Sequence, residues 1–460
     1  MSATPVLSSL VVLVALSLVA QTPPATPAAA PGVVAAVAAP KAPASVVAGI
    51  PVNYDEAKVG AYTLPDALTL ANGKPVRDAK TWVTKRRPEI VKLFATEQYG
   101  VAPGRPEGES FDVFDKGTPA FGGKAVRKQV RIYFAKGKDG SSDKSGPSID
   151  VVEYLPAGAK GPAPMLLSIN FNAVQLAVDD LGIVPQMVWD EKTNTRVMPA
   201  APTVGRTFGR IPVEKFVDAG FGVATFYYGD VDPDDATGFA EGIRAKYMKP
   251  GQTGEDDRAP EAWGSIAAWA WGMSRVEDYF ETDKDVDARR VTIHGISRLG
   301  KTVMWAGAND TRFAAVIASC SGEGGTALSR RDYGETIAHL TAPTRYPYQF
   351  AANYAKWGGF PDKAPMDANL LVALIAPRPL LLQTGSTDQW SDPKGEFLAE
   401  VAAGPVYKLL GKEDLGTDVW PAAKTPIFSN GVNYYMHEGG HGMVAGDWDI
   451  YLQFLKMHFQ

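Results

Sequence analysis

A serine, an arginine and a lysine lie within five residues of one another in the segment GISRLGKT, residues 295 to 302. The strand-like run RRVTIHG leads into this segment and a helix-like run follows it, so Ser297 falls on a predicted turn between a strand and a helix. A serine on such a turn can be the nucleophile of acyl transfer, and its usual motif is G-x-S-x-G because the sharp turn needs small neighbours. Here the second glycine comes one residue late, at Gly300.

The same segment matches the phosphate-binding pattern G-x-x-x-x-G-K-S/T, in which Lys301 and Thr302 would hold phosphates and magnesium. That chemistry also needs an acidic residue at the end of a hydrophobic strand to hold the metal. The next strand-like run, FAAVIASC at 313 to 320, ends in serine and cysteine instead. We therefore expect the match to be a coincidence.

Zinc binding is a third possibility, because His437, Glu438 and His441 match the motif H-E-x-x-H. On a helix, two histidines four residues apart face one side and can bind zinc. Gly439 and Gly440 oppose a helix here, since each costs about 1 kcal/mol relative to alanine, and the preceding VNYYM favours a strand. We expect no metal and no other cofactor.

An acid and a histidine follow Ser297 in the order Ser, Asp, His, which is the order in α/β-hydrolases. Asp388 comes just after the strand-like run RPLLLQTGS, and His441 lies in a Gly-His-Gly loop before the C-terminal helix-like run. Asp388 could instead cap a helix that begins near Pro393, and His441 could be an ordinary loop residue. The other histidines are expected in a strand core, in an insertion, at a strand end and in the last helix: His294, His339, His437 and His458.

The elements around these residues predict an α/β-hydrolase fold, a three-layer αβα sandwich with a mostly parallel sheet. The runs 125 to 135 and 148 to 157 alternate, as antiparallel strands do, whereas VIAS and LLLQ each begin with three apolar residues in a row, as buried parallel strands do. Helices are expected at 261 to 281, 299 to 308 and 447 to 459. The long polar stretches 174 to 215, 229 to 262 and 339 to 372 are expected to be loop insertions over the active-site rim.

The chain of 460 residues has a net charge of −5, which gives no field to attract nucleic acid. Residues 1–20 contain a short apolar run typical of a signal peptide, and residues 21–49 form a Pro/Ala-rich linker. Residues 50–460 are expected to be one catalytic domain. These features predict a secreted or periplasmic protein, not inserted in the membrane after processing, and we expect a monomer.

Four segments together resemble carbohydrate esterase family 15, the glucuronoyl esterases of bacterial type, and the resemblance covers about residues 50 to 460. They are GISRLGK, SGEGGTALSRRDYGET, LIAPRPLLLQTGSTDQWSDPKGEF and GGHGMVAGDWDIYLQFL. The family motif G-C-S-R-x-G-K also has its second glycine one residue late. The resemblance implies an α/β-hydrolase that cleaves esters between 4-O-methyl-glucuronate on xylan and alcohols of lignin, without a metal.

The resemblance implies a role for each matching residue. Ser297 would be the nucleophile, His441 the general base and acid, and Asp388 the group that orients the imidazole. Arg298 would stabilise the oxyanion, because a fixed cation lowers the energy of a developing negative charge. The residues implied to bind the sugar are Lys301, Glu335 and Trp390.

Two positions depart from the family pattern. Ile296 replaces the cysteine of the serine motif, so no disulfide can form there. Cys320 stands where many members have their catalytic glutamate, and a thiol cannot hold an imidazolium by charge. This departure favours Asp388 as the acid, with Glu323 in reserve and Asp392 after it.

The sequence therefore predicts a serine esterase that acts on glucuronoxylan or lignin–carbohydrate esters. Two alternatives stay open. An acetyl-xylan or other carbohydrate esterase would have the same nucleophile and fold, because a fold does not fix the acyl group. A catalytically silent carbohydrate-binding relative would need only the binding residues.

Overall fold

The structure is a computed structural model that describes residues 45–137, 139–200, 209–249, 251–252, 254 and 257–460. Pro43–Gln460 form one compact unit, and every feature below lies in it. The predicted signal peptide and most of the predicted linker lie outside the described residues, so both stay predictions. Within the described residues, none of the helices has the length and apolar composition of a membrane span.

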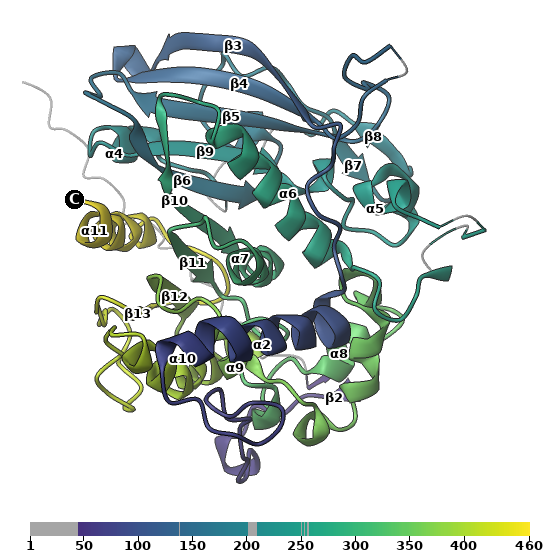
Figure 1. Cartoon of the computed structure of the whole chain (residues 1–460), viewed down its shortest axis with the longest axis vertical. Helices are drawn as coiled ribbons and strands as arrows, with labels where there is room; N and C mark the ends of the chain where they lie inside the picture. Colours follow the sequence, from purple (N-terminus) through teal and green to yellow (C-terminus); the bar gives the residue numbers. More distant parts are fainter. Residues whose placement is uncertain (1–44, 138, 201–208, 250, 253, 255–256) are drawn as a thin grey trace, which may run out of the picture. The chain divides into compact units, whose positions relative to one another are not determined.

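In the described part of the chain the central sheet has nine strands, in the order β13-β12-β11-β10-β6-β9-β5-β4-β3 (Figure 1). The six strands from β13 to β9 are parallel, and β5, β4 and β3 continue the sheet antiparallel. Their bounds are β3 Ser110–Ala120, β4 Ala125–Tyr133, β5 Ser148–Pro156, β6 Ala163–Asn170, β9 Gly222–Tyr227, β10 Val286–Ile296, β11 Ala315–Ser319, β12 Leu380–Gly385 and β13 Val432–His437. Two small hairpins add β1 Val46–Val47 with β2 Ile50–Pro51, and β7 Val188–Asp190 with β8 Thr195–Val197.

Helices cover both faces of the sheet, as the three-layer prediction requires (Figure 1). One apolar core packs the sheet against α2 Arg87–Phe94, α6 Ser265–Phe280, α7 Arg298–Asn309, α9 Ala368–Ala373 and α10 Pro393–Leu409. The other core packs it against α3 Val174–Ala177, α4 Val213–Val217 and α11 Asp447–Phe459. The remaining α-helices of the described residues are α1 Ala79–Thr81, α5 Ile243–Lys246 and α8 Ile337–Thr341.

The apolar parallel strands divide their side chains between the two cores. Leu380 and Leu382 of β12 pack into the first core and Leu381 packs into the second, because successive side chains of a strand point to opposite faces. This is why LLLQ and VIAS contain no polar alternation. The predicted antiparallel pair is confirmed as β4 and β5, and the three predicted helices are confirmed as α6, α7 and α11.

The three long insertions all follow the carboxyl ends of parallel strands. The stretch 174 to 215 follows β6, 229 to 262 follows β9, and 339 to 372 comes after β11. Since these strands are parallel, their carboxyl ends lie at the same end of the sheet, and the insertions begin there. This is the end at which α/β proteins bind their ligands. Ser297 lies at this same carboxyl-terminal end of the sheet, directly after β10.

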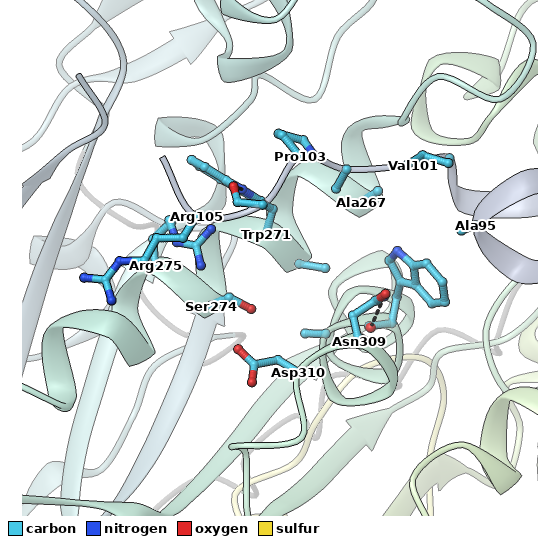
Figure 2. Close-up of a pocket in the computed structure, with 16 residues that line it drawn as sticks. Ala95, Val101, Pro103, Arg105, Ala267, Trp271, Ser274, Arg275, Asn309 and Asp310 are labelled. Carbon is cyan, nitrogen blue, oxygen red and sulfur yellow. Dashed lines mark hydrogen bonds between the residues drawn. The ribbon is translucent and has the colours of Figure 1, made fainter. Parts of the chain in front are cut away.

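A separate cavity of about 250 Å³ lies between α6, α7 and the segment 95 to 105 (Figure 2). Trp271 and Ala267 line it together with polar groups such as Arg105 and Asn309. Asn309 ends α7, whereas Ser297 immediately precedes it, and the 12 residues of this helix span about 18 Å. This cavity is therefore distinct from the rim that holds the predicted nucleophile.

Candidate active site

Ser297 occupies a strained turn between the last residue of β10 and the first residue of α7. Its backbone has φ 58° and ψ −126°, a region that residues with a side chain rarely adopt. Its N–H donates to the carbonyl of Ser319, 2.8 Å away, which ties the turn to β11. A strained turn held in this way is typical of a nucleophile raised above the end of its strand.

The late glycine has a steric reason. A Cβ atom added to Gly300 would lie 2.8 Å from the carbonyl oxygen of Ser319, so only glycine lets α7 pass this close to β11. A Cβ on Gly295 would lie 2.2 Å from the carbonyl oxygen of Leu299. The close approaches thus fall at positions 295 and 300, and position 299 can be a buried leucine.

A cavity of about 350 Å³ collects nearly all of the predicted site residues. Its lining includes Ser297, Arg298, Lys301, Glu335, Asp388, Trp390 and His441. Leu340, Arg345, Tyr346 and Gln349 complete one wall, and all four come from the insertion 339 to 372. The two reserve acids, Glu323 and Asp392, do not line this cavity.

His441 and Asp388 form a pair at the cavity. Nδ1 of His441 lies 2.7 Å from Oδ2 of Asp388, and the hydroxyl of Ser391 lies 3.1 Å from the same nitrogen. The His441 side chain is 40% exposed and the Asp388 side chain is 4% exposed. Because a carboxylate accepts, it holds the proton on Nδ1 and leaves Nε2 as the nitrogen that can take a proton.

Asp388 does not cap the helix that begins at Pro393, so this alternative role is wrong. The N-cap of α10 is Asp392, whose side chain accepts from the N–H of Gly395 at 2.9 Å. Asp392 also forms an ion pair with Arg331 at 2.8 Å, so this second reserve acid is engaged away from His441.

Glu323 is committed to another set of contacts. Its carboxyl group accepts from the hydroxyl of Ser329 at 2.6 Å and from that of Tyr354 at 3.0 Å. Burial raises the pKa of Glu323 to about 8, so this acid is mostly neutral at pH 7. Of the three candidate acids, the structure brings Asp388 to the histidine.

Arg298 is held by an acidic residue that the sequence did not indicate. Its Nη1 forms an ion pair with Asp234, and its guanidinium lies 4.6 Å above the centre of the Tyr346 ring. Burial alone would lower the pKa of Arg298, but the charge of Asp234 raises it above its ordinary value. The arginine therefore stays charged, and Asp234 offsets the cost of a cation at a helix N-terminus.

Lys301 lies one helical turn beyond Ser297. Its Nζ donates to the carbonyl of Ser321 at 2.7 Å, and burial lowers the pKa of Lys301. Thr302 is fully buried and its hydroxyl donates to the carbonyl of Arg298 at 2.9 Å. Since Thr302 is closed off in this way, it cannot hold magnesium, and the phosphate-loop interpretation is wrong.

Glu335 and Trp390 lie side by side. The N–H of Glu335 donates to the carbonyl of Trp390 at 2.8 Å, and its carboxylate accepts from Arg345 at 2.9 Å. The Arg345 guanidinium lies 5.5 Å from the centre of the Trp390 ring and 4.7 Å from that of Tyr346. The site thus contains Arg345, Tyr346 and Asp234, which no motif signalled because they lie in the insertions.

The H-E-x-x-H segment does not form a helix. His437 ends β13, and its Nδ1 lies 3.0 Å from Oδ2 of Asp447 and 2.8 Å from Nε2 of Gln383. Its Nε2 lies 3.0 Å from the carbonyl of Gly440. Both ring nitrogens are engaged, so His437 cannot join His441 on zinc. This geometry rules out the zinc interpretation.

Within the described ranges, the His, Cys, Asp and Glu side chains close enough to share a metal are Cys320, Asp388 and His441, whose ligand atoms lie within 4.8 Å of one another. The thiol of Cys320 donates to the carbonyl of Gly442 at 3.4 Å. Burial raises the pKa of Cys320 well above its ordinary value. A neutral thiol is a poor metal ligand, so the group is better described as a histidine–aspartate pair beside a buried cysteine.

Known proteins are similar to this chain over most of its length. The sequence model of a family described as glucuronyl esterase, fungi, matches residues 258–411. A curated carbohydrate esterase from an unknown prokaryotic organism is 42% identical over 415 residues, which cover 88% of this chain and 92% of that protein.

Solved structures agree in fold and sequence. A glucuronoyl esterase from Solibacter usitatus gives a TM-score of 0.80 at 44% identity and covers 88% of this chain and 100% of its own. A structure described as a promiscuous CE15 esterase from a marine bacterial metagenome gives a TM-score of 0.77 at 40% identity, with 89% and 100% covered. The chain therefore belongs to carbohydrate esterase family 15, the glucuronoyl esterases, and is a carboxylic ester hydrolase with an α/β-hydrolase fold.

Proposed function

We propose that this esterase hydrolyses esters of 4-O-methyl-glucuronate, such as those between xylan and lignin alcohols, with Ser297, His441 and Asp388 as its triad. The observation that carries the proposal is the cavity that these residues share with groups suited to a sugar. A sugar ring needs hydrogen-bonding groups and an aromatic face, which Lys301 and Trp390 would supply.

The proposed reaction is an acyl transfer in two halves. Nε2 of His441 takes the proton from the Ser297 hydroxyl as its oxygen attacks the ester carbonyl, and Arg298 stabilises the resulting oxyanion. The intermediate collapses when the bond to the alcohol oxygen breaks, and His441 gives its proton to that oxygen. Water then attacks the acyl-enzyme, again losing a proton to His441, and the proton returns to Ser297 as the uronic acid leaves.

The charges in the cavity predict a difference in affinity between the substrate and the product. The ester is neutral at its carboxyl carbon, whereas the product is an anion. Arg298 and Lys301 would therefore hold product more tightly than substrate. Free glucuronate should compete with the ester in inhibition kinetics, and an absence of competition would remove these two residues from the binding proposal.

A second candidate function is a broader esterase that also removes acetyl groups from sugars. One solved relative is described as a promiscuous esterase, and this favours a site that accepts more than one acyl group. We further propose that residues 1–20 direct export and are removed, which the mass of the processed N-terminus would test.

The test compares the protein with Ser297→Ala on benzyl glucuronate and on an acetylated sugar. We expect the unaltered protein to cleave the glucuronate ester and the variant to lose at least about 10³-fold in kcat. Cleavage of the acetyl ester alone would overturn the substrate class. An unchanged rate in Ser297→Ala would overturn the mechanism.

A further inference from the structure

Asp234 lies at the centre of a hydrogen-bond network around Arg298. Its Oδ2 accepts from Nη1 of Arg298 and from the hydroxyl of Tyr228 at 3.1 Å. Its Oδ1 accepts from Nε2 of Gln349 at 2.6 Å. The hydroxyl of Tyr348 donates to Asp234 as well, since it lies 3.0 Å from Oδ1 and 2.9 Å from the backbone carbonyl oxygen. The Asp234 side chain is only 9% exposed, so this carboxylate is enclosed by its donors.

The network joins two insertions that are distant in sequence. Asp234 belongs to the stretch 229 to 262 after β9, whereas Tyr348 and Gln349 belong to the stretch 339 to 372 after β11. Arg298 is the residue after the nucleophile and begins α7. One carboxylate therefore ties both insertions to the arginine beside Ser297.

The contacts give the Arg298 guanidinium a defined orientation. Asp234 engages Nη1, and the Tyr346 ring covers one face at 4.6 Å from its centre. A guanidinium carries five N–H groups in one plane, so fixing one nitrogen and one face sets the direction of the others. Groups fixed in this way stabilise a transition state well, because they need not reorganise as charge develops.

A carboxylate next to the arginine also has an opposing effect, since it reduces the attraction of Arg298 for an oxyanion. Three neutral donors share the charge of Asp234 with the arginine: Tyr228, Tyr348 and Gln349. Hydrogen bonds from several donors spread the charge of a carboxylate and weaken its field. We therefore expect the gain from orientation to exceed the loss from neutralisation.

We propose that Asp234 is a positioning residue that acts through Arg298 and fixes its guanidinium for oxyanion stabilisation, an inference that rests on the proposed function. A residue of this kind affects the chemical step more than substrate binding. Its effect must also vanish when Arg298 is absent.

The experiment measures kcat and KM on benzyl glucuronate for Asp234→Asn, Arg298→Ala and the double variant. We expect Asp234→Asn to lower kcat about 10- to 100-fold and to change KM less than about twofold. In the Arg298→Ala background the same change should lower kcat less than about twofold further, because coupled residues are not additive.

Asp235→Asn is the matched control. Asp235 is the next residue, carries the same charge, and accepts from Nε1 of Trp189 at 3.2 Å, away from Arg298. We expect its kcat to equal that of the unaltered protein. If Asp234→Asn does not fold, Tyr348→Phe removes one donor and keeps the carboxylate, and it should lower kcat about threefold only while Arg298 is present.

Three results would overturn the inference: equal effects of Asp234→Asn and Asp235→Asn, a loss that is as large without Arg298 as with it, or a loss confined to KM. If the unaltered protein fails to cleave benzyl glucuronate, the proposed function falls instead. The two failures are therefore distinguishable in one set of assays.

Discussion

The molecule contains two histidine–aspartate pairs whose histidines lie four residues apart in the sequence, and the pairs differ in what surrounds the histidine. His441 lies 2.7 Å from Asp388 and His437 lies 3.0 Å from Asp447, in each case through Nδ1. The first histidine is 40% exposed at the cavity, whereas the second is 2% exposed at the end of β13. In the part of the chain that the structure describes, no hydrogen bond engages Nε2 of His441, but Nε2 of His437 donates to Gly440.

The difference shows that the second ring nitrogen decides what such a pair can do. His437 has no nitrogen left for a reacting proton, and its bond to Gly440 holds the backbone next to His441. Burial alone would lower the pKa of His437, but Asp447 raises it above its ordinary value. The buried pair His437–Asp447, here called the inner pair, is thus suited to hold the loop after β13. The more exposed pair His441–Asp388, the outer pair, is suited to move protons.

The largest effect is expected for His441→Ala. Loss of the proposed general base should lower kcat on benzyl glucuronate at least about 10³-fold. The free energy of unfolding should change by less than about 1 kcal/mol, because the side chain is half exposed. Steady-state kinetics and denaturant unfolding check both statements, and a kcat near that of the unaltered protein would contradict the role of the outer pair.

A somewhat smaller loss is expected for Asp388→Asn, about 10²- to 10⁴-fold in kcat, because the amide no longer fixes the imidazole tautomer. Glu323→Gln is the control. Since burial raises the pKa of Glu323 to about 8, glutamine resembles its neutral form, and kcat should stay within about threefold. An active Asp388→Asn beside an inactive Glu323→Gln would assign the acid to Glu323.

His437→Gln should act mainly on stability. Removing one partner of a buried pair costs about 3 kcal/mol in the free energy of unfolding, measured in urea, while kcat at low temperature should fall less than about tenfold. Glu438→Gln, which breaks the exposed pair with Lys424 on the same loop, should cost less than about 1 kcal/mol. Equal costs in the two variants would show that the inner pair does not hold the loop.

The smallest effect concerns pH. Because the folded-state pKa of His437 is raised, its stabilising contribution is fully present below the unfolded value of about 6.5 and is lost as pH rises through the folded value. The difference in Tm between the unaltered protein and His437→Gln should therefore be largest near pH 6 and shrink at alkaline pH. A difference that stays constant over this range would contradict a protonated inner pair.

Patterns of neighbouring residues in the sequence predicted the strands and helices whose formation depends on those neighbours. The apolar runs predicted the parallel strands, and the chain order of Ser297, Asp388 and His441 predicted three residues that line one cavity. His294 is a buried strand residue, as expected, and its Nδ1 forms a hydrogen bond of 2.9 Å with the hydroxyl of Ser168. The edge strand β3 was missed, because SFDVFDKGTPA is largely exposed and contains glycine and proline.

The missed site residues depend on contacts between distant segments. Asp234 and Arg345 lie in long insertions, where nothing in the neighbouring sequence indicates the partner of a charged side chain. Asp234 is 64 residues from Arg298 along the chain. The role of His437 was also hidden, because its partner Asp447 and its acceptor Gly440 become apparent only when the loop is folded.

Chemical rescue by imidazole tests most directly which pair moves the proton. Benzyl glucuronate hydrolysis would be measured for His441→Ala and His437→Ala with increasing imidazole. We expect imidazole to enter the open site and raise the rate of His441→Ala several-fold with saturation, and to leave His437→Ala unchanged, because that site is buried. Rescue of His437→Ala without rescue of His441→Ala would contradict the assignment of His441 as the general base.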